Sequence, residues 1–95
     1  MPDIQAFREE INLIDTQIAD AFQRRMNTAL EIAKYKQENG LPVFNLEREQ
    51  EVMARVLAQC PPELTMYAER LYQTLFDVSR SYQQRFVDRE MELGS

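Results

Sequence analysis

The sequence predicts an all-α fold of three helices. Its 95 residues contain only two glycines and four prolines, so long stretches have no helix breaker. In the first stretch apolar residues alternate at spacings of three and four, which is the period of one helix face. Gly40 and three of the prolines lie in two short segments, ENGLPVFN and CPPEL, which divide the chain into three parts. We expect three helices, little or no strand and one domain over residues 1–95.

The first helix is expected over about residues 3–39, where apolar residues recur at positions 4, 7, 11, 14, 18 and 21. Such a helix is a rod of roughly 54 Å, because each residue adds about 1.5 Å. A compact domain of this length has a radius of gyration near about 12 Å, so about a third of the rod would project with an exposed apolar stripe. The long helix of a second copy would cover that stripe. The sequence therefore predicts an intertwined homodimer.

The second and third helices are expected over about residues 46–59 and 63–92. Gly40 can cap the first helix, and Pro42 prevents its continuation. Asn45 can then cap the second helix, with Glu47 and Glu49 in its first turn. The segment CPPEL separates the second helix from the third. We interpret the last two residues, 94–95, as a cloning remnant.

The composition excludes several classes of function. Eleven basic against sixteen acidic residues give a net charge of −5, which repels nucleic acid and anionic membranes. Histidine is absent and Cys60 is the one thiol, so we expect no metal site and no catalysis that depends on imidazole. The chain has no apolar run of membrane-spanning length and no recognisable secretion signal. We therefore expect a reduced, cytoplasmic protein.

Two cations interrupt the apolar face of the first helix. When residues 4–36 are aligned in heptads, Arg25 takes the same heptad position as the isoleucines at positions 4, 11, 18 and 32. Lys36 follows eleven residues later, within about 20° in azimuth and roughly 16 Å along the axis. A single cation in such a place more often extends along the apolar surface to reach water. Two together indicate that an anionic group meets them inside the bundle.

Polar residues also replace apolar ones on the other two helices. Ser79 and Gln83 lie four apart in a column with aromatic residues at positions 72, 76 and 86. A polar pair that specifies helix register is an equal alternative. On the second helix the motif NLERE places Asn45, Arg48 and Glu49 at the start of an apolar stripe. Taken alone, this motif is more simply explained as a solvated first turn.

Arg8 lies at the edge of the first apolar stripe, 17 residues before Arg25. It is therefore about 25 Å further along the rod and about 100° around it, so one chain cannot bring both side chains to one small ligand. In an antiparallel homodimer, Arg8 of one chain would approach Arg25 and Lys36 of the other. The two-fold axis would then create two such pockets.

Four fragments resemble the all-helical class of chorismate mutases, with matching spacings over essentially the whole chain. They are FREEINLID, RRMNTALEIAKYK, GLPVFNLERE and LFDVSRSYQQ. The resemblance implies conversion of chorismate to prephenate, at the branch leading to phenylalanine and tyrosine, in a domain-swapped homodimer with two active sites. That reaction is an intramolecular rearrangement without proton transfer, covalent intermediate or cofactor, so the absence of histidine is no objection to it.

The resemblance also implies which residues act. Arg25 and Arg8 from the partner chain would hold the two substrate carboxylates, a task suited to guanidinium groups. Lys36 and Gln83 would donate to the ether oxygen, which gains negative charge in the transition state. Glu49 would accept a hydrogen bond from the ring hydroxyl.

Three further substrate contacts are implied by the same resemblance. Arg48 would lie near a substrate carboxylate and the loop, and Ser79 would contact a carboxylate. Asn45 stands where an aspartate is expected. That position can contact the ring hydroxyl through its backbone amide. We therefore expect asparagine in place of aspartate to change the substrate affinity more than the activity.

Three alternatives stay open. An isochorismate pyruvate lyase or an aminodeoxychorismate mutase would share the fold and the cations, although the NLERE turn resembles a mutase more. A noncatalytic helical dimerisation module would share the long apolar stripe and the acidic composition. In each case the chain could be free-standing or a part of a bifunctional enzyme.

Overall fold

The computed structural model describes residues 3–94 and confirms an all-α fold. The elements are α1 (Ile4–Glu38), α2 (Leu46–Ala58), the short 3₁₀ helix η1 (Pro62–Leu64) and α3 (Thr65–Gly94), with no strand in this range. The three predicted helices are present with ends that differ by one or two residues. Because α3 continues to Gly94, its predicted end at residue 92 falls two residues short. Of the two residues interpreted as a cloning remnant, Ser95 lies outside the described residues.

The helix ends have local causes. Asp3 Oδ1 accepts a hydrogen bond from the Ala6 amide at 2.9 Å and caps the start of α1. Gly40 has a φ of +66°, and the Leu41 amide after it donates to the Lys36 carbonyl at 2.8 Å, which ends the same helix. Asn45 Oδ1 accepts from the Arg48 amide at 3.1 Å and caps α2.

The start of α3 differs from its predicted start at residue 63 because a 3₁₀ turn comes first. Pro62 occupies the first turn of η1, where a residue without an amide hydrogen leaves no donor unpaired. The Leu64 amide donates to the Pro61 carbonyl at 2.9 Å, which is the tight bond of a 3₁₀ turn. Regular α-helix follows from Thr65.

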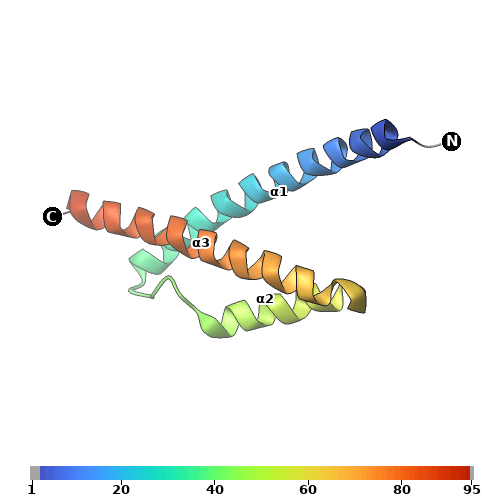
Figure 1. Ribbon diagram of the computed structural model, residues 1–95. Coiled ribbons are helices and arrows are strands. Elements are labelled where there is room, and N and C mark those ends of the chain that lie inside the picture. Colours follow the sequence, from blue (N-terminus) through green and yellow to red (C-terminus); the bar gives the residue numbers. More distant parts are fainter. Residues whose placement is uncertain (1–2, 95) are drawn as a thin grey trace.

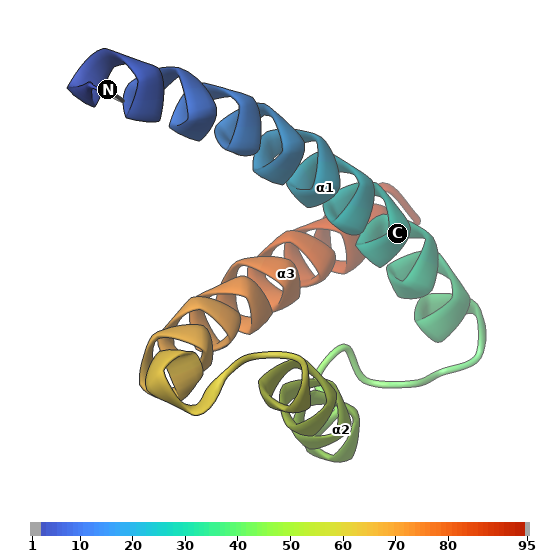
Figure 2. The same ribbon diagram turned by 90° about the vertical axis from the view of Figure 1, so that its right-hand side faces the viewer.

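The central element is α3, which packs against both of the other long helices. It crosses the C-terminal half of α1, and α2 lies along its other side (Figures 1 and 2). The N-terminal half of α1 extends away from the rest of the molecule (Figure 1). The radius of gyration is 17.2 Å and the molecule measures 64 × 27 × 15 Å, well beyond the roughly 12 Å radius of a compact domain.

The core is small and lies where α1 meets α3. Its buried members are Ala29 and Ala33 of α1 and Phe76, Ser79 and Gln83 of α3. The two alanines allow the helix backbones to approach closely. By contrast, no residue of α1 before residue 25 is buried, and large apolar side chains there are exposed, such as Ile4 at 62% and Phe7 at 56%. No helix in the described range is both long and apolar enough to span a membrane.

Candidate active site

A cavity of about 430 Å³ lies between the C-terminal half of α1, the loop after it, the start of α2 and the middle of α3. This volume suits a ligand of small-metabolite size. Its walls include apolar groups from all three helices, among them Ile32, Val52 and Phe76. The polar side chains that line it are Arg24, Arg25, Thr28, Lys36, Asn45, Arg48, Glu49, Ser79, Arg80 and Gln83.

Seven of the eight predicted site residues line this cavity. Arg25 and Lys36 come from α1, Ser79 and Gln83 from α3, and Asn45, Arg48 and Glu49 from the start of α2. Three separate polar interruptions of apolar faces therefore meet in one place. Their roles toward a substrate remain predictions.

Arg8 is the predicted residue that this chain does not bring to the cavity. It lies in the exposed N-terminal half of α1 and is absent from the cavity lining. This placement agrees with the separation of about 25 Å along the helix that the residue numbering requires.

The cavity is strongly cationic in an acidic protein. Arg24, Arg25, Lys36, Arg48 and Arg80 line it, and Glu49 is the one carboxylate among the described lining residues. The surplus of four positive charges contrasts with the net charge of −5 for the whole chain. Cations concentrated in a concave site attract and hold anions, and guanidinium groups suit carboxylates in particular.

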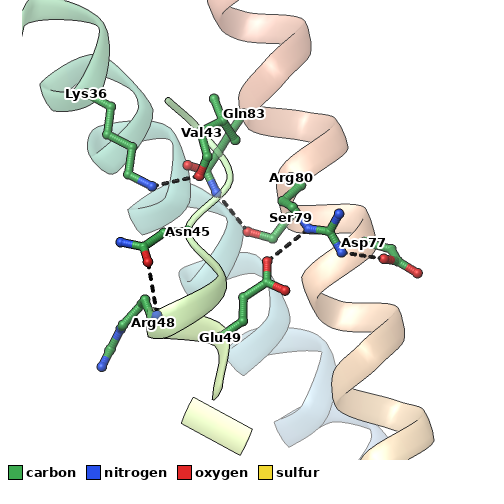
Figure 3. A network of polar contacts seen from close by, with 9 residues as sticks. All are labelled: Lys36, Val43, Asn45, Arg48, Glu49, Asp77, Ser79, Arg80 and Gln83. Atoms are coloured by element: carbon green, nitrogen blue, oxygen red, sulfur yellow. Dashed lines mark hydrogen bonds and ion pairs between the residues drawn. The ribbon is translucent and has the colours of Figure 1, made fainter. Parts of the chain in front are cut away.

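Lys36 ties the loop between α1 and α2 to the cavity wall. Its Nζ atom donates to the Val43 carbonyl at 2.7 Å, and the lysine side chain is half-buried (Figure 3). An ammonium group has three donors, so this bond leaves two for a ligand. The contact therefore fixes where the charge is held without exhausting its donors.

Ser79 and Gln83 form a buried polar pair on α3. They are 8% and 7% exposed, and Gln83 Nε2 donates to Ser79 Oγ at 3.1 Å (Figure 3). The Gln83 Oε1 atom is buried and has no hydrogen-bond partner among the described residues. Buried polar atoms are nearly always paired, so an unpaired one in a cavity wall indicates that a ligand or water belongs there. Because a hydroxyl can donate or accept, Ser79 can hold the amide in either orientation.

Glu49 contacts an arginine that the sequence analysis did not single out. Arg80 Nε lies 2.9 Å from Glu49 Oε2, an ion pair that lacks hydrogen-bond alignment, and Arg80 Nη2 donates to Asp77 Oδ1 at 2.7 Å (Figure 3). The Arg80 guanidinium carbon also lies 5.0 Å from the centre of the Phe44 ring. In the sequence, only the position of Arg80 next to Ser79 in the motif SRSYQ connects it with the site. Its partner Glu49 is 31 residues away, so no local pattern indicates the pair.

Asn45 and Arg48 are both exposed at the start of α2. The Asn45 side chain is occupied as the cap of α2. The Arg48 guanidinium contacts Glu51 at 3.3 Å and is turned away from the Glu49 carboxylate (Figure 3). Both observations agree with the solvated first turn that was the simpler explanation of this motif. Both residues nevertheless line the cavity.

No cluster of three or more potential metal ligands of the His, Cys, Asp or Glu type occurs within residues 3–94. The side chains that line the cavity offer fixed cations, two amides, two hydroxyls and one carboxylate. Such a set can bind and orient an anion and stabilise negative charge as it develops.

Comparisons with known proteins show the family to which the chain belongs. Residues 7–84 match the family described as chorismate mutase type II, which covers most of the chain. A bifunctional chorismate mutase/prephenate dehydratase of Buchnera aphidicola subsp. Schizaphis graminum (strain Sg) is 30% identical over 89 residues. That alignment covers 92% of this chain but only 23% of the relative's length. No solved structure matches the chain significantly. With the family match spanning all three helices and the cavity between them, this chain belongs to the chorismate mutase type II family.

Proposed function

We propose that this chain converts chorismate to prephenate by an intramolecular rearrangement. The observation that carries the proposal is the cationic cavity, where Arg25 and Lys36 of α1 meet Gln83 of α3 although the two helices are far apart in the sequence. The substrate is a dianion with an ether oxygen between its two reacting parts. The reaction breaks the carbon–oxygen bond of that ether and forms a carbon–carbon bond within the same molecule, so no proton acceptor or nucleophile has to be supplied.

The first task of the protein is to hold the substrate in its reactive shape. In water chorismate must fold into a chair-like conformer before the two reacting carbons approach each other. Fixed guanidinium groups that grip both carboxylates select that conformer, which removes much of the entropic cost from the barrier. Arg25 supplies one such group within the cavity. The partner's Arg8 supplies the other in this proposal, and Ser79 and Arg48 add polar contacts.

The second task is to stabilise charge on the ether oxygen. As the bond to that oxygen breaks, the oxygen becomes more negative, so donors aimed at it bind the transition state more tightly than the ground state. Lys36 retains two free donors beyond its bond to Val43. Gln83 is held by Ser79 in a buried position, and its amide retains a second N–H. Glu49 accepts from the ring hydroxyl, and Asn45 contacts the same hydroxyl through its backbone amide.

The site is completed by a second copy of the chain. The N-terminal half of α1 exposes a stripe of large apolar side chains, which are Ile4, Phe7, Ile11, Ile14, Ile18 and Phe22. An exposed stripe of this length is stable in water when another protein surface covers it. An antiparallel α1 from a partner would cover it and would carry Arg8 toward the cavity of the first chain. Two-fold symmetry would then give two equivalent sites per dimer.

The test is incubation of the purified protein with chorismate, measuring the loss of chorismate and the formation of prephenate. The same protein is incubated with isochorismate and with aminodeoxychorismate in parallel. Turnover of chorismate with the highest kcat/KM supports the proposal. Preferred release of pyruvate from isochorismate, or preferred rearrangement of the amino substrate, would assign the chain to a sister reaction. No turnover together with no calorimetric binding of any of the three dianions would favour a noncatalytic dimerisation module.

A further inference from the structure

We propose that Arg80 is a positioning residue, which neutralises and orients Glu49 so that a carboxylate can serve as an acceptor inside a site for a dianion. The inference rests on the proposed function. It assigns a role to a residue of the cavity that the substrate contacts described above do not use. Its basis is the ion pair between α3 and α2.

The contact differs from the other ion pairs around it. The pairs Lys34–Glu31, Arg48–Glu51 and Arg80–Asp77 each join residues three apart on one helix. The pair between Arg80 and Glu49 instead joins two helices, and its side chains are only 35% and 19% exposed. A partly buried pair that bridges two elements is screened less by solvent than a pair on one helix surface.

The Arg80 guanidinium is held from three directions. Glu49 Oε2 lies 2.9 Å from Nε, Asp77 Oδ1 accepts from Nη2 at 2.7 Å, and the guanidinium carbon lies over the Phe44 ring, 5.0 Å from its centre. These neighbours belong to α2, to α3 and to the loop between α1 and α2. A guanidinium fixed in this way keeps its positive charge beside the Glu49 carboxylate.

The contact with Arg80 leaves one carboxylate oxygen of Glu49 available to a ligand. The ion pair engages Oε2, so Oε1 can accept a hydrogen bond from a ligand in the cavity. A bare carboxylate in this place would repel the two carboxylates of the substrate. Arg80 offsets this charge, because its other carboxylate partner, Asp77, is 68% exposed and is screened by solvent, whereas Glu49 is only 19% exposed. The acceptor is then retained with less repulsion.

The same pairing bears on substrate choice. A neutral hydroxyl donates well to a carboxylate that is already balanced by a cation. A protonated amine in place of that hydroxyl gains most from a carboxylate whose charge is unbalanced, because the attraction is between net charges. Arg80 therefore favours the hydroxyl-bearing substrate over its amino analogue.

The test is a double-mutant cycle with Arg80→Met and Glu49→Gln, measured as kcat and KM for chorismate. Arg80→Met should raise KM by about tenfold and change kcat much less, since repulsion weakens ground-state and transition-state binding alike. On the Glu49→Gln background the same replacement should have little further effect, because no carboxylate is left to neutralise. The preference for aminodeoxychorismate over chorismate should rise in Arg80→Met alone. Arg80→Lys should recover part of the loss.

Arg85→Met is the matched control. It removes the same charge from an exposed position five residues later on α3 that does not line the cavity, and it should leave both constants unchanged. Equal effects of Arg80→Met on the wild-type and Glu49→Gln backgrounds would overturn the inference, since they would show that Arg80 contacts the substrate itself or supports only the fold. Unchanged KM in Arg80→Met, with normal turnover by the wild type, would overturn it as well. A wild-type protein that does not convert chorismate would contradict the proposed function instead, and the inference with it.

Discussion

At the scale of single residues, the cavity is built from polar groups that are held in place before any ligand arrives. Lys36 is tied to the Val43 carbonyl and Gln83 to the Ser79 hydroxyl. Both arrangements restrict side chains that would otherwise lose freedom on binding, which is the physical meaning of preorganisation. The arrangement of Lys36 gives a direct test of the proposed chemistry.

Replacing Lys36 with methionine should lower kcat by about 100- to 1000-fold, because the charge that meets the ether oxygen in the transition state is lost. The methionine chain keeps most of the apolar contacts of the lysine stem, so the far-ultraviolet circular dichroism spectrum should stay helical. Lys34→Met is the matched control, since Lys34 is exposed two residues away and pairs with Glu31 on the surface. Turnover near that of the wild type in Lys36→Met would contradict the proposed role of this residue.

At the scale of elements, the junction between α1 and α2 decides where Lys36, Asn45 and Glu49 lie relative to one another. The chain reverses at Gly40, whose φ of +66° is a conformation that residues with a side chain adopt at a cost. Apart from Gly40 and its two chain neighbours, no atom of the described residues lies within 4 Å of the position that a Cβ atom would take there. The penalty of a substitution is therefore one of backbone conformation and not of steric overlap.

Gly40→Ala should lower the free energy of unfolding by about 1 kcal/mol, because the Cβ atom of alanine makes the left-handed backbone conformation less favourable. Gly40→Asn should lose less, since asparagine adopts this conformation more readily. Urea denaturation at one fixed protein concentration measures both changes. Gly94→Ala is the control, because Gly94 has a negative φ and also has open space around it. An equal loss from Gly40→Ala and Gly94→Ala would show that the turn does not depend on the backbone of glycine.

At the scale of the whole molecule, one chain is too elongated to bury the apolar face of its own first helix. Its longest dimension is 64 Å and its shortest 15 Å, and the protruding half of α1 has no buried residue. In the homodimer that we propose, this half would pack on the partner chain and would supply the second arginine of the neighbouring site. Arg8 is the residue whose role depends on that assembly.

Mixing the inactive variants Arg8→Ala and Arg25→Ala should restore activity if the sites are shared between chains. A mixed dimer has one site with both arginines and one with neither, so a fully exchanged equal mixture should reach about a quarter of wild-type activity. Turnover is measured before and after subunit exchange, with exchange itself followed by mass. No recovery after complete exchange would place both arginines of each site on one chain, and light scattering that gives a monomer would contradict the dimer.

Much of the fold and of the cavity was predictable because its causes are local. The isoleucine column placed Arg25 and Lys36 on one face of α1, and the spacing of four placed Ser79 beside Gln83; the structure shows both pairs lining the cavity. The caps at Gly40 and Asn45 were likewise predicted from single residues. Arg80 was not singled out, since an ion pair between residues of different helices leaves no periodic signal. The 3₁₀ turn before α3 was missed because proline permits both kinds of helix start.

By itself the sequence determined the helices, their ends and the polar residues on each apolar face, because helical periodicity and capping depend on neighbours within a few positions. Only the tertiary structure decided that these faces meet around one cavity, that the Val43 carbonyl holds Lys36, and that Arg80 pairs with Glu49. These contacts depend on how α3 packs across the alanines of α1 and along α2. Packing is set by the shapes of surfaces distant in the chain, which no local pattern encodes.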